Sequence, residues 1–325
     1  MNAYLKLMRV DQYIKNIIVL LPLLFSSELF TEGKFLPVLL GTFMFCLVSS
    51  AVYIMNDIAD ADSDAKNPAK CNRPIPSGKV KKNVAVVLCV ILVIIPVAVS
   101  LFLLPSFSAA WILIYFVMNI AYSLGLKNVI VLDVVFIVAG FVIRAIYGSL
   151  IADIDTSKWL FYLVAALVTF TTVGKRVNEK RRMERTGVCI RKVIENVSER
   201  TLLIFLYLAV ILLNIFYIIW VSGLTVPEDC ATNPLWTIPF MILFSWESYV
   251  IIQNNNTDHD PLPLFVRDKM WILTFLILLV SVIITFYVEV PFINDGVEVF
   301  RYKMNGRRSG ICEVSRSPIL LQASH

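Results

Sequence analysis

The sequence predicts an all-α protein: a polytopic membrane helical bundle of about nine transmembrane helices with a cytoplasmic cap. Its 325 residues are 58% hydrophobic and only 16% charged, and the mean hydropathy is +0.77. These values lie outside the usual range of soluble domains. Apolar runs long enough to cross a bilayer also recur along the chain, and Lys and Arg gather in alternate connections between them.

Each predicted span is an apolar run close to the roughly 17–25 residues that a transmembrane helix needs. The first, fourth and sixth runs are the shortest of the nine. The predicted spans cover residues 16–30, 36–56, 83–104, 109–124, 129–151, 158–174, 201–223, 236–253 and 270–289. We expect them to form a single transmembrane domain over residues 1–290, followed by a poorly structured C-terminal tail over residues 291–325.

Basic residues indicate the orientation of the chain in the membrane. Lys and Arg are frequent before the first run and after the second, fourth and sixth runs, whereas the connections near 31–35, 105–108 and 222–235 are nearly free of them. By the positive-inside rule the N-terminus and the basic connections lie in the cytoplasm. We therefore expect a multi-pass protein of the inner (cytoplasmic) membrane whose polar site faces the cytoplasm.

Several function classes are excluded by what the sequence lacks. It has six scattered Cys without a C-x-x-C pair, only His259 and His325 as histidines, and no glycine-rich phosphate loop. A disulfide framework, a histidine-based zinc site and a nucleotide-binding loop are not expected, nor is a cleaved signal peptide. The net charge of +5 falls mainly on the cytoplasmic side, where it suits anionic lipids or phosphorylated substrates. We expect no nucleic-acid partner, and a homo-oligomer is compatible with the sequence.

The first polar motif stands where the second apolar run meets water. Asp57, Asp60 and Asp64 follow one another at steps of three and four residues, so on one helix they share a face within roughly 80° of arc. The helix macrodipole disfavours acids at this C-terminal end, so a positive group is expected among them. Carboxylate oxygens suit Mg²⁺, which proteins often hold with one or two carboxylates plus substrate phosphates. The alternative is a solvated acidic helix end without a ligand.

The stretch 56–78 also carries a family resemblance. Its pattern Asn-Asp-x-x-Asp-x-x-x-Asp, followed after a basic residue by Arg-Pro-Ile-x-x-Gly, resembles the first aspartate-rich motif of the UbiA superfamily of intramembrane prenyltransferases. The resemblance implies that the three aspartates hold Mg²⁺ and thereby a diphosphate, with Asn56 assisting. It also implies that Lys70 and Arg73 contact phosphates.

A basic segment leads into the first apolar run. Alone, it could be an interfacial anchor whose Lys and Arg reach the lipid headgroups. Its Gln12, Lys15 and Asn16 resemble the Gln-Trp-x-Lys-Asn pattern of the superfamily branch that includes decaprenyl-phosphate phosphoribosyltransferase, although Tyr13 replaces the Trp and Val10 the preceding Pro. The resemblance implies that Gln12, Lys15 and Asn16 bind substrate.

A second polar motif runs from Tyr122 through Lys127 to Asp133 and Arg144. Asp133 and Arg144 are eleven residues apart, so on one helix they share a face about three turns apart. Ionisable groups inside membrane spans are usually functional, and the alternative is a structural ion pair with other helices. We expect Arg144 to lie deeper, linked to Asp133 and available to substrate.

This motif resembles the Tyr-Ser-x-x-Leu-Lys pattern of the family, which is followed by aspartate. The resemblance implies catalytic roles for Lys127 and Asp133, with Asp133 completing the metal site or orienting Lys127. It implies that Tyr122 hydrogen-bonds substrate. Many members carry two aspartates here, whereas this chain has only Asp133.

Lys175 and Arg176 open the predicted sixth connection, where the same branch carries Lys-Arg-x-x-Glu. The resemblance implies that both bind phosphate, Arg176 through a bidentate fork and Lys175 as a point charge. The charged run 180–185 that follows is expected to be a solvated face.

Taken together, the resemblance implies an enzyme that moves 5-phosphoribosyl from phosphoribosyl diphosphate to a polyprenyl phosphate and releases diphosphate. Mg²⁺ would neutralise the leaving group, and the attacking phosphate, already an anion, needs no strong base. One alternative is a prenyltransferase that moves a polyprenyl group from its diphosphate to an aromatic or other small acceptor. A membrane transporter is a third interpretation, but no paired breaks in midplane helices are evident.

Overall fold

The computed structural model describes residues 3–66, 70–105, 107–123, 125–126, 129–187, 194, 197–224, 230–254, 268–290 and 292–294. In this part of the chain every regular element is a helix and no strand occurs, which confirms the all-α prediction. The elements are α1 (Ala3–Met8), η1 (Val10–Leu20, a 3₁₀ helix), α2 (Leu21–Leu24), α3 (Phe35–Ala59), α4 (Ala61–Ala65), α5 (Lys82–Leu103), α6 (Ser108–Ser123), α7 (Ile130–Ala152), α8 (Lys158–Thr186), α10 (Glu199–Ser222), η3 (Pro234–Thr237), α11 (Ile238–Asn254) and α13 (Lys269–Tyr287).

Seven helices among the described residues are long and apolar enough to cross a membrane, so the protein is a multi-pass membrane protein. They are α3, α5, α7, α8, α10, α13 and the continuous η3–α11 pair. The count of nine is not confirmed. The fourth predicted span is the 16-residue helix α6, and the first is replaced by η1 and the single turn α2.

Helix α8 is longer than the sequence pattern indicated. It passes the predicted span end at residue 174 and continues to Thr186. Its charged second half consists largely of good helix formers, and the pairs Arg176–Glu179 and Lys180–Glu184 stand at helical spacings. The helix ends at Gly187, whose φ of +68° is the left-handed conformation typical of a helix C-cap. Lys175 and Arg176 therefore lie on a rigid helix and not in a connection.

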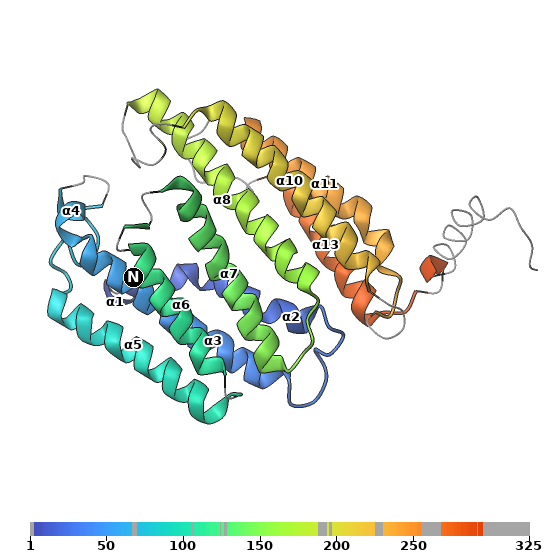
Figure 1. Ribbon diagram of the computed structural model, residues 1–325, viewed down its shortest axis with the longest axis horizontal. Helices are drawn as coiled ribbons and strands as arrows, with labels where there is room; N and C mark the ends of the chain where they lie inside the picture. Colours follow the sequence, from blue (N-terminus) through green and yellow to red (C-terminus); the bar gives the residue numbers. More distant parts are fainter. Residues whose placement is uncertain are drawn as a thin grey trace, which may run out of the picture.

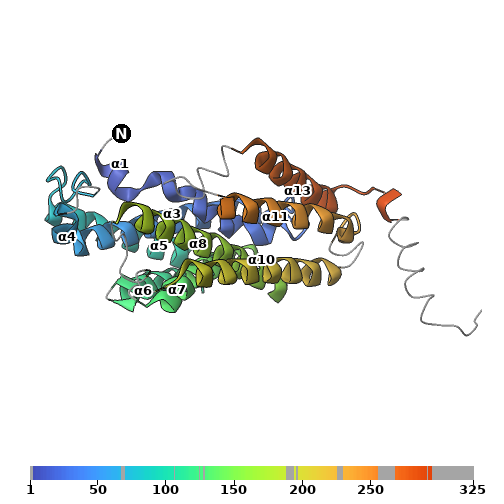
Figure 2. The same cartoon turned by 90° about the horizontal axis from the view of Figure 1, so that it is seen from above.

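The long helices run roughly parallel to one another, obliquely across the view of Figure 1, and consecutive spans reverse direction (Figure 1, Figure 2). Neighbours along the chain pack on each other, as α3 does on α5, α7 on α8, α8 on α10, and α11 on α13. The end of α3, the start of α5 and the short helices α1 and α4 lie at the same end of the bundle, on the left of both views. We call this end the polar end.

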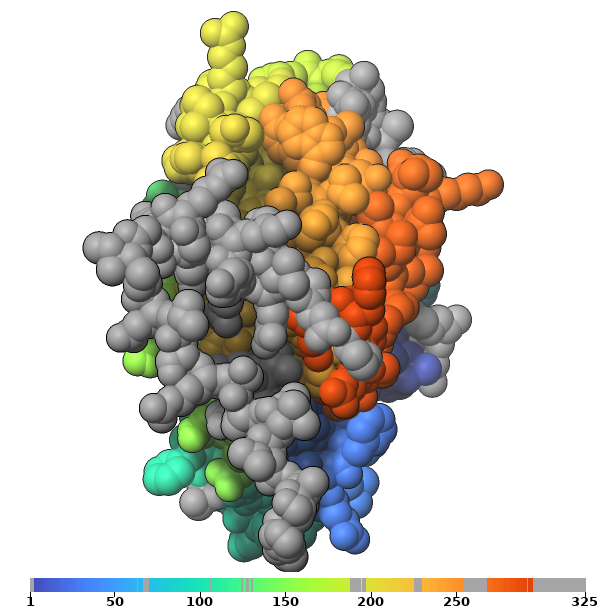
Figure 3. All heavy atoms as spheres, turned by 90° about the vertical axis from the view of Figure 1, so that its right-hand side faces the viewer, coloured from blue at the N-terminus to red at the C-terminus, as the bar shows by residue number. Residues whose placement is uncertain are grey.

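The N-terminal segment closes the bundle at the opposite end. Phe25, directly after α2, stacks on Phe286 of α13 and contacts Trp220 of α10. The hydroxyl of Tyr287 donates to the carbonyl oxygen of Leu24 at 2.8 Å. Figure 3 looks at this end and shows α13 (deep orange) beside α11 (lighter orange). Elements from the two halves of the chain thus join far from the polar end.

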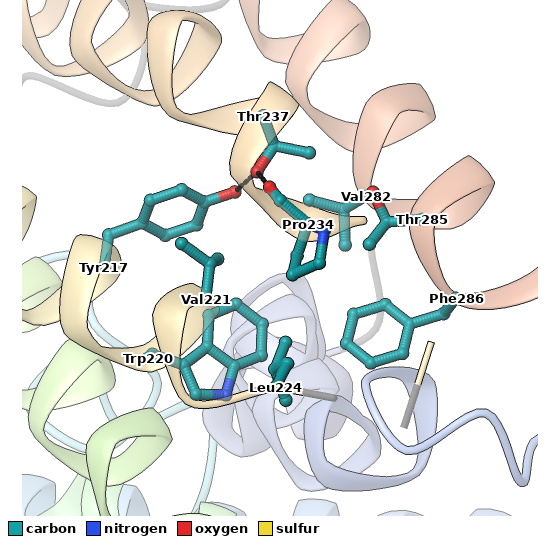
Figure 4. Close-up of a pocket in the computed structure, with 9 residues that line it drawn as sticks. All are labelled: Tyr217, Trp220, Val221, Leu224, Pro234, Thr237, Val282, Thr285 and Phe286. Carbon is teal, nitrogen blue, oxygen red and sulfur yellow. Dashed lines mark hydrogen bonds between the residues drawn. The ribbon is translucent and has the colours of Figure 1, made fainter. Parts of the chain in front are cut away.

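A small cavity of about 10 Å³ lies in the core near this closed end. Figure 4 shows its mainly apolar lining, in which Tyr217 donates a hydrogen bond to Thr237 and Thr237 donates to the carbonyl of Pro234. Such a volume is about that of a single water probe. The cavity is therefore a packing defect of the core and not a substrate site.

A close backbone approach fixes η1 against α7. A Cβ atom added at Gly148 of α7 would collide with the backbone carbonyl of Val19. Only glycine allows this contact, and through it η1 carries Lys15 and Asn16 toward the middle of the bundle.

We predict that Gly148→Ala destabilises the protein by about 1–3 kcal/mol or more, because the added methyl group meets backbone atoms that cannot move independently. Thermal unfolding in detergent measures the loss. Gly223→Ala is the matched control, since its nearest neighbours would lie at 3.5 and 3.6 Å and its φ is −89°. Equal unfolding temperatures for the two variants would contradict this account of the packing.

Candidate functional site

The aspartate motif does not lie on one continuous helix. Helix α3 includes Asp57 and ends at Ala59, with Asp60 as its C-cap residue, and Asp64 lies on the separate short helix α4. This break corrects the expectation of a single helical face for all three carboxylates. In the described residues no three His, Cys, Asp or Glu side chains gather closely enough to hold one metal ion.

Two of the three aspartates nevertheless meet around one guanidinium group. Asp57 and Asp64 are each only 2% exposed. Arg73 Nη1 donates to Asp64 Oδ2 at 2.6 Å and to Asp57 Oδ1 at 3.3 Å. Arg9 Nη2 donates to the same Asp57 oxygen at 2.7 Å, and Lys70 Nζ lies 3.5 Å from Asp64 Oδ1. We call these five side chains the aspartate cluster.

A turn that is anchored by buried apolar residues holds Arg73 beside the carboxylates. The backbone N–H of Ser77 donates to the carbonyl of Arg73, and that of Val80 donates to Pro74. Ile75 and Val80 are buried in the apolar cluster that contains Leu7. This anchored turn covers the end of α3. Beside it, the amide oxygen of Asn56 accepts a hydrogen bond from Ser123, which ties α3 to α6.

Asp133 belongs to a second buried charge cluster, formed by α6, α7 and α8. Its Oδ1 accepts a hydrogen bond from the Tyr122 hydroxyl at 2.6 Å, and its Oδ2 lies 2.9 Å from Arg176 Nη2. Arg176 Nη1 also donates to Glu179 at 2.5 Å. The side chains of Asp133 and Arg176 are 1% and 2% exposed. We call these four residues the Asp133 cluster.

The sequence suggested a link between Asp133 and Arg144, but in the structure these two side chains have different partners. Arg144 is 5% exposed, and its side chain donates to Asn16 Oδ1, the Gly140 carbonyl and the Tyr115 hydroxyl, each at 2.8 Å. All of these acceptors are neutral. The aromatic rings of Phe45, Tyr115 and Phe141 lie 4.8–5.1 Å from its Cζ atom, an arrangement that stabilises a cation. Asp133 pairs with Arg176 because α8 remains helical beside α7.

Two residues of the N-terminal motif, Asn16 and Gln12, lie in different surroundings. Asn16 is buried, accepts from Arg144 and donates to Cys46 Sγ at 3.2 Å. Gln12 donates to the adjacent Asp11 at 2.7 Å and belongs to neither charge cluster. Lys127 lies outside the described residues.

Lys15 stands among positive charges. Its side chain is accessible to water, yet the protein around it removes part of its hydration, and this loss lowers the pKa of Lys15. The charges of Lys175, Arg144 and Arg9 lower the pKa further. Because like charges repel, the electrostatic field in this region favours an anionic ligand.

Sequence reasoning missed two members of these clusters, Arg9 and Glu179, and the contact between Tyr115 and Arg144. Arg9 stands in the same basic segment as Lys15, and Glu179 follows Arg176 by three residues, a spacing that brings side chains together on a helix. Nothing in the sequence indicated that Tyr115 would meet Arg144, because that contact depends on how α6 and α7 are rotated.

The contacts of Asp57, Asp64 and Arg73 indicate which ligands the site can hold. Asp57 and Asp64 supply two hard oxygen donors, and the Arg73 nitrogen between them lies where a divalent cation could replace it, so the residues fit Mg²⁺. Nearby Lys and Arg side chains can bind phosphate groups. The fold and these clusters define the class of protein: a multi-pass membrane protein whose buried acidic and basic side chains gather at one end of the helical bundle.

The chain belongs to the UbiA prenyltransferase family, whose family model matches residues 19–273. It is 29% identical over 285 residues to the decaprenyl-phosphate phosphoribosyltransferase of Mycolicibacterium smegmatis, covering 85% of this chain and 89% of the relative. It is 28% identical over 271 residues to the enzyme of the same name from Mycobacterium tuberculosis, covering 82% and 88%.

The fold agrees with that of a solved family member. The structure of a UbiA homolog from Archaeoglobus fulgidus bound to DMAPP and Mg²⁺ has a TM-score of 0.64 and 15% sequence identity to this chain. The match covers 85% of this chain and 98% of that one. The architecture predicted from the sequence is therefore that of the family.

We predict that the affinity for inorganic diphosphate falls as pH rises through the lowered pKa of Lys15, at a pH below the usual lysine value of 10.5. Deprotonation removes a positive charge, so wild type should lose about 10-fold in affinity. Lys15→Arg should postpone the loss to higher pH, because arginine stays protonated. Competition binding with labelled diphosphate between pH 7 and 10.5 measures this effect. Lys158→Arg, at the opposite end of α8, should follow wild type; a Lys15→Arg curve that also follows wild type would contradict the prediction.

Proposed function

We propose that the protein transfers the 5-phosphoribosyl group from phosphoribosyl diphosphate to a polyprenyl phosphate and releases diphosphate. The observation that carries this proposal is the pair of buried carboxylates, Asp57 and Asp64, that face one guanidinium nitrogen at the polar end. Support also comes from the two mycobacterial relatives, which carry the name decaprenyl-phosphate phosphoribosyltransferase and match most of this chain. Both proposed substrates are anionic, and the Lys and Arg side chains near the carboxylates can bind anionic groups.

Mg²⁺ is the proposed metal, and Asp57 and Asp64 would hold it, with Asp60 as a further oxygen donor. When bound, the ion acts as a Lewis acid that neutralises the charge on the leaving diphosphate. The family structure that contains both Mg²⁺ and a diphosphate ester supports this choice. Asn56 holds the end of α3 in place through Ser123.

The remaining residues position the two anions. Arg73, Arg9 and Lys70, already beside the carboxylates, take the phosphates of the donor. Lys15 and Lys175 attract the lipid phosphate from the bundle interior, and Gln12 and Lys127 complete the phosphate contacts. As the bond from the anomeric carbon to diphosphate breaks, its electron pair leaves with diphosphate, and an oxygen of the lipid phosphate forms the new bond.

The Asp133 cluster has a positioning role in this proposal. Arg176 neutralises Asp133 and Glu179, so α7 and α8 keep a fixed separation at the site. The Tyr122 hydroxyl, bound to Asp133, is proposed to hydrogen-bond the ribose. Arg144, held by Asn16, keeps a positive charge under the lipid phosphate.

We further propose that the polar end faces the cytoplasm, with the protein in the inner membrane. The aspartate cluster and the charged C-terminal half of α8 lie toward this end, and the positive-inside rule places Lys-rich and Arg-rich segments in the cytoplasm. Phosphoribosyl diphosphate, a soluble polyanion, would then reach the site from that side. A single domain over residues 1–290 remains our proposal for the boundary of the membrane unit, with 291–325 as a tail.

The proposed reaction is tested with membranes that contain the protein, labelled phosphoribosyl diphosphate and polyprenyl phosphate. We expect label in the organic phase only with Mg²⁺, and a loss of at least about 100-fold in Asp57→Asn and Asp64→Asn, which remove the charge of a proposed ligand. Asp62→Asn is the matched control, because Asp62 lies exposed on the same short helix α4. The proposal would be contradicted if, with the wild-type protein, all label stayed in the aqueous phase, or if an aromatic acid became prenylated instead.

Arg73→Ala provides a test of the metal site that does not depend on turnover. Without Arg73 the two buried carboxylates lose a shared counter-ion, and unpaired buried charges are destabilising. We expect Mg²⁺ to raise the unfolding temperature of this variant by at least roughly 4 °C more than that of wild type. Lys34→Ala, whose partner Glu28 lies outside both clusters, should respond like wild type; no difference between Arg73→Ala and wild type would argue against a metal here.

A further inference from the structure

One buried side-chain amide in the charged half of α8 has no hydrogen-bond partner among the described residues. Asn178 is 8% exposed, and neither its Nδ2 nor its Oδ1 forms a hydrogen bond with any described residue. Native proteins satisfy nearly all of their buried polar groups, so a side chain that leaves both a donor and an acceptor unused is uncommon. An unused donor and acceptor at the same position indicate a ligand that supplies both.

The helix position of Asn178 relates it to the basic residues of α8. It follows Lys175 by three residues, so the two side chains share a helix face, and the charge of Lys175 acts on Lys15. It directly precedes Glu179, which holds Arg176. Gly174, four residues earlier, packs closely against Ile252 of α11. Asn178 thus stands between the cationic region and the end of α11.

Because the Asn178 side chain can both donate and accept a hydrogen bond, only some classes of ligand can satisfy it. A phosphate or diphosphate oxygen only accepts, so it would leave Oδ1 unsatisfied inside the protein. A prenyl chain has neither a donor nor an acceptor. A hydroxyl group both donates and accepts, and adjacent hydroxyls can satisfy both ends of one amide.

We infer that Asn178 binds the ring hydroxyls of the ribose in the donor substrate and thereby selects a sugar diphosphate over a prenyl diphosphate. This inference rests on the proposed function and adds to it a residue that determines donor specificity. Nδ2 donates to one hydroxyl oxygen and Oδ1 accepts from a second hydroxyl. The negative charges of the donor are handled by other residues, so Asn178 contributes to the recognition of the sugar alone.

The test compares Asn178→Leu, similar in size but apolar, with Asn214→Leu. Asn214 is a matched control because its amide is fully engaged, donating to the Val210 carbonyl and to Ser245. Purified proteins are titrated with phosphoribosyl diphosphate and, separately, with inorganic diphosphate, both in the presence of Mg²⁺. Unfolding temperatures are measured on the same samples without ligand.

For Asn178→Leu we expect affinity for phosphoribosyl diphosphate to fall roughly 10- to 100-fold, while affinity for inorganic diphosphate stays within about twofold of wild type. Its unfolding temperature should equal or exceed that of wild type, because the substitution removes an unsatisfied buried group. Asn214→Leu should unfold at a lower temperature and keep the preference of wild type for the ribosylated ligand.

Two results overturn the inference while leaving the proposed function intact. In the first, wild type transfers label to the lipid, but Asn178→Leu binds both ligands as wild type does. In the second, Asn178→Leu loses affinity for both ligands equally and unfolds early, as expected of a structural residue that binds water. If wild type neither transfers label nor prefers phosphoribosyl diphosphate over inorganic diphosphate, the proposed function and the inference fail together.

Discussion

The structure depends on the neutralisation of charge inside an apolar bundle. Carboxylates removed from water are tolerated only when cations and hydrogen-bond donors surround them. Here Asp57 and Asp64 share Arg73, and Asp133 is held by Arg176 and Tyr122. Both clusters join helices at the polar end, so the contacts that let the chain fold also place acids and bases where a polyanion could bind.

A packing contact of the N-terminal segment helps to position a residue of the site. Gly148 permits η1 to approach α7, and η1 then brings Asn16 to the Arg144 guanidinium. In the part of the chain that the structure describes, the hydrogen-bond acceptors of Arg144 are all neutral and aromatic faces lie beside it, so these neighbours do not neutralise its positive charge. A cation held in this way can attract an anion without first breaking an ion pair, whereas Arg73 must release its carboxylates.

Much of the fold could be predicted from the sequence, because long apolar runs specify where membrane helices lie. The limits of α8 could not, since charged residues that form good helices resemble a solvated connection in composition. Helix rotation and the break between α3 and α4 also escaped prediction. Spacing alone suggested that Asp133 and Arg144 share a helix face and are linked. In the structure the ion-pair partner of Asp133 is Arg176 of α8. Asp57 and Asp64 stand out in the sequence as part of a polar motif, but their shared contact with Arg73 depends on the three-dimensional arrangement of the capping turn.

The central claim is that the carboxylates now bound to Arg73 form the metal site of a transferase. Its most direct test is an anomalous-scattering measurement on crystals grown with Mn²⁺ in place of Mg²⁺ and with phosphoribosyl diphosphate. The account predicts a manganese peak in contact with Asp57 and Asp64, with the Arg73 guanidinium turned toward the diphosphate. A structure in which the ligand is bound, the manganese lies elsewhere and Arg73 still bridges both carboxylates would contradict it.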